Sequence, residues 1–232
     1  YAAAKDELYT GGYRIYTSLD PAKQEILQSA VDQVLSFDAE TADNGIYALQ
    51  GAAVAVNNDT GLVEAIVGGR SQETSTYTLN RAFQSFRQPG SSIKPLIVYA
   101  PALEEGYASF SSVKDINVDA AKEPKADVAS LPGNWITLRQ AVEKSRNGAA
   151  WWLFNEVTPE EGLSYLTQMQ FDKIVPDDYN MAASLGGFTY GVTAEEMAGA
   201  FSALENGGVY REPDCIVRME NLAGEDIYTG RE

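Results

Sequence analysis

Histidine is missing from this chain of 232 residues, and cysteine occurs only once. Without histidine there can be no Ser-His-Asp or Cys-His catalytic set, and most zinc sites are excluded as well. The single Cys215 cannot form an internal disulfide, so cysteine usage indicates nothing about the redox compartment. The residues predict neither a cofactor nor a metal.

Positive charge and long apolar runs are also scarce. Against 33 Asp and Glu there are 17 Lys and Arg, which gives a formal net charge of −16. Such a surface repels phosphate backbones, so we expect no nucleic acid partner. No apolar run is long enough to span a bilayer, and the first residues do not form a signal peptide. If the protein works at a membrane, its anchor is expected outside this chain.

Enough apolar residues are present for one large domain, or one domain with a smaller appendage. Hydrophobic residues make up 44% of the chain, including 13 Tyr and 8 Phe, so the chain can form a sizeable hydrophobic core. The first 47 residues are interpreted as a lead-in. In it, YRIYTSL alternates like a strand, and Asp20 and Pro21 begin a helix. The polar stretch SFDAETADNG then predicts a boundary between residues 1–47 and a main body, 48–232.

The main body is predicted to contain both strands and helices. Two strand-like runs, Ala52–Val56 and Leu62–Val67, flank turn-forming residues and predict a β-hairpin. One helix is predicted through IKPLIVYAPALEEG, a second from Thr137 to about Lys144, and a third from AAWWLFNEV. Thr193 and Glu196 form a capping box for a helix that Asn206-Gly207-Gly208 ends. Residues 107–134 are predicted to be irregular.

Two Ser-x-x-Lys pairs occur, one in RQPGSSIKP and the other in SSVKD. A serine nucleophile needs a base, and without histidine a lysine is the candidate. Ser91 follows a Pro-Gly turn and is predicted to open a helix, with Lys94 one turn below it against an apolar segment. Burial and the helix N-terminus would both lower the pKa of that lysine. Ser111 and Lys114 have no helical pattern and a solvated lysine, so we interpret this second pair as accidental.

A Ser-x-Asn sequence, Ser145-Arg146-Asn147, lies at the end of a predicted helix. A second hydroxyl there can relay a proton, and an amide can hold a substrate carbonyl. The alternative is purely structural, because Asn147-Gly148 also suits the turn that ends a helix. Spacing alone leaves both interpretations open.

With these motifs, the chain resembles the transpeptidase domain of class A (bifunctional) penicillin-binding proteins. That family combines Ser-x-x-Lys and Ser-x-Asn with Lys-Thr-Gly. Four blocks resemble it in order: AAVAVNNDTGLVEAIVGGR, NRAFQSFRQPGSSIKPLIVYAPALEEG, ITLRQAVEKSRN and SLGGFTYGVTAEEMAGAFSALENGG. GGYRIYTSLDPAKQEILQSAV resembles the stretch between the family's glycosyltransferase and transpeptidase domains. The resemblance implies the penicillin-binding/serine β-lactamase-like α+β fold, an antiparallel sheet between helical layers.

The resemblance also implies a function, a peptidoglycan D,D-transpeptidase at the extracytoplasmic face of the bacterial cell membrane. Ser91 would attack the penultimate D-Ala of a D-Ala-D-Ala stem peptide, and the acyl group would pass to an amine of a neighbouring stem. Lys94 would be the base, Ser145 the proton relay and Asn147 the group that orients substrate. β-Lactams would acylate Ser91 as covalent inhibitors, and the backbone N–H of Ser91 would form half of the oxyanion hole.

The family's third motif, Lys-Thr-Gly, is absent. Tyr228-Thr229-Gly230 has a tyrosine in place of the lysine and lies in an expected hairpin, NLAGEDIYTG. In the family that motif lies on a later strand. We therefore expect this chain to be the N-terminal portion of a transpeptidase domain, with only the first two strands of the family's sheet. The C-terminal remainder is expected as a separate, non-covalently held chain, on which activity would depend.

Two other functions are considered. A non-catalytic scaffolding or β-lactam-sensing relative would have no chemical reason to keep Ser91, Lys94, Ser145 and Asn147 together. A β-lactamase would need a base such as a glutamate to activate the deacylating water, and the sequence shows no distinct motif for one.

Overall fold

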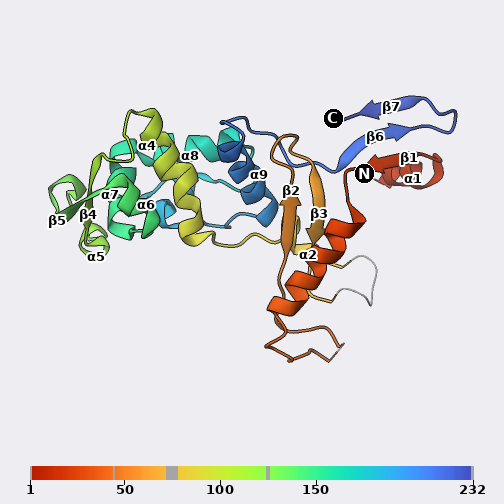
Figure 1. Ribbon diagram of the computed structural model, residues 1–232, viewed down its shortest axis with the longest axis horizontal. Helices are drawn as coiled ribbons and strands as arrows, with labels where there is room; N and C mark the ends of the chain where they lie inside the picture. The colour runs from red at the N-terminus through yellow and green to blue at the C-terminus, as the bar shows by residue number, and fades with distance from the viewer. Residues whose placement is uncertain (1, 44, 72–77, 124–125, 231–232) are drawn as a thin grey trace. The chain divides into compact units, whose positions relative to one another are not determined.

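The computed structural model describes residues 2–43, 45–71, 78–123 and 126–230 of the chain (Figure 1). The chain divides into two compact units, Tyr1–Ser85 with Thr193–Glu232, and Phe86–Val192. Each unit combines helices with antiparallel strands, as predicted for an α+β protein. The predicted boundary after residue 47 follows the sequence blocks rather than these units, and it stays a prediction.

The first unit contains the predicted lead-in and hairpin. Its elements in chain order are α1 (Ala2–Thr10), β1 (Arg14–Thr17), α2 (Pro21–Val34), β2 (Ala53–Val56), β3 (Val63–Val67), α3 (Arg81–Gln84), α9 (Ala194–Glu205), β6 (Ile216–Glu220) and β7 (Asp226–Thr229). β2 and β3 pair antiparallel with Ala53 opposite Val67, which confirms the hairpin. A separate antiparallel sheet has the order β1-β6-β7, and its β6–β7 hairpin confirms the one expected from NLAGEDIYTG.

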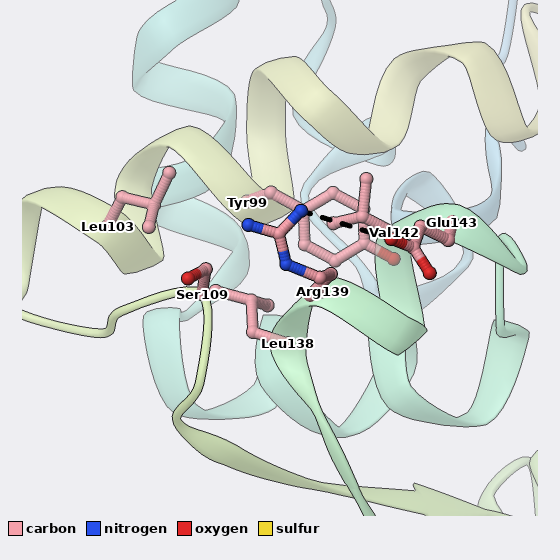
Figure 2. Close-up of a pocket in the computed structure, with 7 residues that line it drawn as sticks. All are labelled: Tyr99, Leu103, Ser109, Leu138, Arg139, Val142 and Glu143. Atoms are coloured by element: carbon pink, nitrogen blue, oxygen red, sulfur yellow. Dashed lines mark ion pairs between the residues drawn. The ribbon is translucent and has the colours of Figure 1, made fainter.

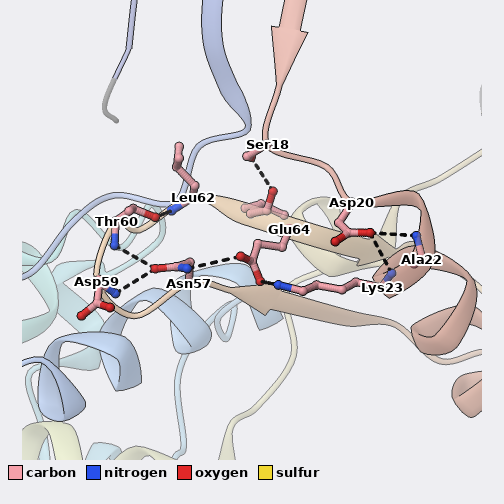
Figure 3. A network of polar contacts seen from close by, with 10 residues as sticks. Ser18, Asp20, Ala22, Lys23, Asn57, Asp59, Thr60, Leu62 and Glu64 are labelled. Atoms are coloured by element: carbon pink, nitrogen blue, oxygen red, sulfur yellow. Dashed lines mark hydrogen bonds and ion pairs between the residues drawn. The ribbon is translucent and has the colours of Figure 1, made fainter.

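Polar contacts fix α2 on the hairpin (Figure 3). The Asp20 carboxylate accepts hydrogen bonds from the N–H groups of Ala22 at 2.8 Å and Lys23 at 3.2 Å, so it caps α2 as predicted. Lys23 in turn forms an ion pair with Glu64 on β3. The Ser18 hydroxyl donates to the carbonyl of Val63 at 2.6 Å. The lead-in is therefore anchored along β3 rather than attached only by the chain.

The second unit begins with the Ser-x-x-Lys segment. In chain order it contains η1 (Gly90–Ile93), η2 (Pro95–Tyr99), α4 (Ala100–Glu104), β4 (Ser112–Ile116), α5 (Val118–Ala121), η3 (Val128–Ser130), β5 (Gly133–Thr137), α6 (Leu138–Glu143), α7 (Asn147–Val157), α8 (Pro159–Gln168), η4 (Pro176–Asp178) and η5 (Met181–Leu185). Buried side chains of η2, α7 and α8 pack into its core; among them are Ile97, Val98, Leu153, Phe154, Leu163 and Leu166.

The single helix predicted through IKPLIVYAPALEEG is instead three segments of different pitch. The first, η1, is a 3₁₀ turn in which the Lys94 N–H bonds to the Ser91 carbonyl; the second, η2, is a π turn, followed by α4. Pro95 and Pro101 have no N–H to donate to an i−4 carbonyl, so a continuous α-helical ladder cannot form.

The prediction of irregular structure over 107–134 was wrong. β4 and β5 pair antiparallel, with Ser112 opposite Thr137 and Ile116 opposite Gly133. The buried residues of β4, Val113 and Ile116, are three positions apart instead of two, so β4 shows no alternation in the sequence. Lys114 is half-buried, and its amine donates to the carbonyl of Ala129 at 3.0 Å in an exposed hydrogen bond.

The remaining helix predictions agree with the structure. Thr137 and Gln140 form a capping box for α6, and Thr193 and Glu196 form one for α9. Gly207, with φ of +84°, follows the end of α9 as predicted. No helix in the described ranges is both long and apolar enough to cross a membrane.

Candidate active site

Lys94 is buried completely, with 0% of the residue exposed. Its amine donates hydrogen bonds to Asn147 Oδ1 at 2.7 Å, to the Ser145 carbonyl at 2.9 Å and to Ser145 Oγ at 3.2 Å. No salt bridge found within the described residues involves Lys94. Burial without a carboxylate partner lowers the pKa of Lys94, because the protonated amine loses its hydration. The amine is therefore suited to act as a base.

The Ser145–Asn147 loop covers this amine. Ser145 follows α6 with a φ of +47°, a left-handed conformation that is strained for serine. Because the chain turns there, the Ser145 carbonyl and hydroxyl and the Asn147 side chain all reach the Lys94 amine. Asn147 is the first residue of α7, so the interpretation of Asn147-Gly148 as a helix end is wrong. The positive end of the α7 dipole also disfavours charge on the nearby amine.

Strand β4 contacts both the Ser145–Asn147 loop and the start of α7. Arg146 donates to Asp115 Oδ2 through Nε at 2.7 Å and lies 2.5 Å from it through Nη2, and the Asp115 side chain is only 8% exposed. Gly148 packs directly on β4, since a Cβ added there would lie 2.0 Å from the carbonyl oxygen of Ile116. Sequence reasoning missed Asp115 because it missed the strand. The glycine in the first turn of α7 was the available signal.

Ser91 lies on an exposed turn. It belongs to η1, three residues before Lys94, and follows Gly90, whose φ is +56°. Within the described part of the chain its hydroxyl makes no hydrogen bond, so Lys94, Ser145 and Asn147 meet while the Ser91 hydroxyl stays unbound. Hydrogen bonds between a nucleophile and a base are often long when no substrate is bound.

A small pocket lies between η2, α4 and α6 (Figure 2). It has a volume of about 230 Å³ and is lined by Tyr99, Leu103, Ser109, Leu138, Arg139, Val142 and Glu143. Burial and the charge of Asp115 raise the pKa of Tyr99 to about 12, so its phenol keeps its proton. None of the four candidate residues lines this pocket. The described residues also contain no cluster of three or more Cys, Asp or Glu side chains able to hold a metal ion.

Comparison with known proteins identifies the family. Residues 51–229 match the family described as the penicillin binding protein transpeptidase domain. The chain belongs to this family. It is 34% identical over 234 residues to penicillin-binding protein 4 of Bacillus subtilis (strain 168), an alignment that covers 98% of the chain and 35% of that protein. It is 37% identical over 191 residues to penicillin-binding protein 1A of Pseudomonas aeruginosa, covering 79% of the chain and 22% of that protein.

Solved structures show the same fold. The PonA1 protein of Mycobacterium tuberculosis, in complex with penicillin V, superposes with a TM-score of 0.76 at 22% identity over 97% of this chain and 60% of that chain. Penicillin-binding protein 1A of Haemophilus influenzae gives 0.74 at 23% identity, over 95% and 46%. The predicted α+β transpeptidase fold and the resemblance to class A penicillin-binding proteins are thereby confirmed. The chain spans about a third or less of the curated relatives named above.

Proposed function

We propose that this chain carries the acylation site of a peptidoglycan D,D-transpeptidase. Ser91 would form an acyl-enzyme with stem peptides that end in D-Ala-D-Ala, and β-lactams would acylate the same hydroxyl. The observation that best supports this is the Lys94 amine, which is fully buried, has only uncharged oxygens as its hydrogen-bond partners and has a lowered pKa. A non-catalytic descendant would have no reason to keep so costly an arrangement.

The chemistry follows from the hydrogen-bonding capacity of each group. Neutral Lys94 has two N–H groups, enough for Asn147 Oδ1 and the Ser145 carbonyl, so its lone pair is left to take the Ser91 proton as Ser91 Oγ attacks the peptide carbonyl, and the scissile C–N bond then breaks. The proton must reach the departing D-Ala amine. Of the partners of Lys94, only the Ser145 hydroxyl can both accept a proton and donate one, so it is the relay. Asn147 accepts from Lys94 through Oδ1 and keeps its two amide N–H groups for a substrate carbonyl.

A further polypeptide segment is proposed to complete the site. Tyr228-Thr229-Gly230 contains no lysine, and its first two residues lie on β7, paired with β6. β2 and β3 form a sheet of only two strands, which is marginal by itself. We propose that Lys-Thr-Gly and further strands of the transpeptidase domain come from residues other than these 232. The assembly would work at the extracytoplasmic face of the membrane, with 1–47 as the lead-in to the domain.

The test is intact-mass analysis under denaturing conditions, with and without benzylpenicillin, of the chain together with any polypeptide that co-purifies. One penicilloyl group is expected on the 232-residue chain and none on Ser91→Ala. Ser92→Ala is the matched control: the Ser92 hydroxyl donates to the Pro89 carbonyl at 2.7 Å, and its loss should leave the adduct in place. An adduct that persists in Ser91→Ala, or its absence when a Lys-Thr-Gly chain is present, would contradict the proposal.

A further inference from the structure

We infer that Gln88 and Asp178 are positioning residues for Ser91, acting through the segment 186–192. The inference rests on the proposed function, because it concerns how the nucleophile of that site is held. Ser91 is exposed, and its hydroxyl has no hydrogen-bond partner within the described residues. Its position must therefore come from the backbone on either side, and the 87–90 side is where the structure builds a support.

Gln88 makes a two-point contact with Phe188. Its side-chain amide donates from Nε2 to the Phe188 carbonyl at 2.5 Å and accepts the Phe188 N–H through Oε1 at 2.7 Å. The side chain thus satisfies both main-chain groups of one residue, as a neighbouring β-strand would. Gln88 stands three residues before Ser91, so this contact fixes the chain just before the nucleophile.

The two backbones also touch directly. Arg87 and Val192 exchange both main-chain hydrogen bonds, each at 2.9 Å. A Cβ added to Gly186 would lie 2.3 Å from the Gly90 nitrogen, and one added to Gly191 would lie 2.4 Å from the Arg87 carbonyl oxygen. Both glycines have positive φ, +83° and +90°. At Gly186 and Gly191 the segment 186–192 therefore lies directly against the backbone of 87–90, and between these two points the Gln88 side chain joins the two segments.

Asp178 also bonds the segment 186–192, through Thr189. It is 1% exposed, and its Oδ1 accepts from the Thr189 N–H at 2.6 Å and from the Thr189 hydroxyl at 2.7 Å. Its Oδ2 accepts from the Val175 N–H at 3.0 Å. Thr189 follows Phe188, so the buried carboxylate fixes the residue next to the Gln88 contact. A connected path of hydrogen bonds thus runs from Asp178 to the turn that carries Ser91.

The decisive variant is Gln88→Glu, measured as the rate of Ser91 acylation by a fluorescent penicillin relative to the unmodified protein at each pH. An ionised carboxylate can accept the Phe188 N–H but faces the Phe188 carbonyl without a donor. When protonated, the carboxyl supplies one donor and one acceptor, as the amide does. We expect about tenfold slower acylation near pH 7.5 and a return toward the unmodified rate near pH 4.5. The control Gln168→Glu, at an exposed position of α8, should give a pH-independent ratio near one.

A second measurement does not depend on catalysis. Hydrogen–deuterium exchange should be faster in peptides covering 86–92 in Gln88→Met and in Asp178→Asn, while α9 in the other unit exchanges at the unmodified rate. If the unmodified protein forms no penicilloyl adduct, the proposed function fails and the exchange result alone decides whether these residues hold the turn. A flat rate ratio for Gln88→Glu together with unchanged exchange at 86–92 would overturn the inference.

Discussion

Replacing Gly148 by alanine should separate the candidate base from its partners. Gly148 is the second residue of α7, and an added Cβ would lie 2.0 Å from the Ile116 carbonyl oxygen, 2.5 Å from Asp115 Oδ1 and 2.7 Å from the Ile116 nitrogen. Ordinary contact begins at 3.4 Å, so the shortest of these falls short by about 1.4 Å. Two of the three atoms belong to the backbone of the paired strand β4 and cannot rotate away.

The start of α7 must therefore move away from β4 by about 1 Å or more. The bond from Lys94 to Asn147 Oδ1, now 2.7 Å, would then exceed hydrogen-bonding distance. Overpacking of this kind costs about 1–3 kcal/mol, and leaving the buried amine one acceptor short adds about 1–2 kcal/mol. Because a misplacement of about 1 Å can cost on the order of 100-fold in rate, acylation should fall by that factor.

Two assays separate these effects. Urea unfolding measures the loss of stability, and the acylation rate with a fluorescent penicillin, taken well below the transition, reports on the site in folded protein. Gly106→Ala is the matched control, because Gly106 has a φ of +101° but no atom within 4 Å of an added Cβ. It should lose about 1–2 kcal/mol to backbone strain and acylate at the unmodified rate.

If Gly148→Ala unfolds at the same urea concentration as the unmodified protein and acylates equally fast, an added Cβ does not displace α7. If Gly106→Ala loses as much stability and as much rate, the clash with β4 is not the cause. In that case a backbone effect common to both glycines, and not the clash with β4, would explain the result.

Three further outcomes are expected. Burial puts the pKa of Lys94 in the folded protein below its ordinary value of about 10.4. At a pH between the folded and the ordinary pKa, the unfolded state binds more protons, so the free energy of unfolding should rise with pH there. Lys94→Met should reduce this pH dependence, measured by urea unfolding. Arg146→Met should cost more stability than Asp115→Asn, because it leaves the buried carboxylate unpaired whereas the half-exposed arginine can be hydrated. Asp20→Ala should lower the thermal midpoint through a loss of about 1 kcal/mol, and Asp20→Asn should lose much less.

The sequence predicted correctly those elements whose turns or caps depend on residues close together in the chain. The β2–β3 hairpin was predictable because Asn57 and its neighbours specify the turn: the Asn57 side chain accepts from the Asp59 and Thr60 N–H groups at 3.0 and 3.1 Å (Figure 3). The helix starts at Asp20 and Thr193 were equally visible, since each depends on residues within three positions of the cap. The sequence did not reveal β4, because Val113 and Ile116 are buried in a strand that packs on α7 and pairs with β5, and both elements come later in the chain.

The candidate residues were named from their motifs, and their assignment as catalytic stays a prediction. What the sequence could not show was how they meet. Lys94 and Ser145 are 51 positions apart, and their contact needs a left-handed φ that serine rarely adopts. Gln88 and Asp178 were missed for the same reason, since each acts through a partner whose position depends on the tertiary fold.

Ser91 and Lys94 are neighbours in sequence, yet different segments hold the two halves of their site. The turn before Ser91 rests on 186–192, whereas the acceptors of Lys94 are placed by the packing of α7 on β4. Perturbing one support leaves the other intact, so losses from Gln88→Met and Gly148→Ala should multiply in the double variant. A double variant no slower than Gly148→Ala alone would mean that positioning Ser91 has no value once the base is displaced. The two supports would then act as one.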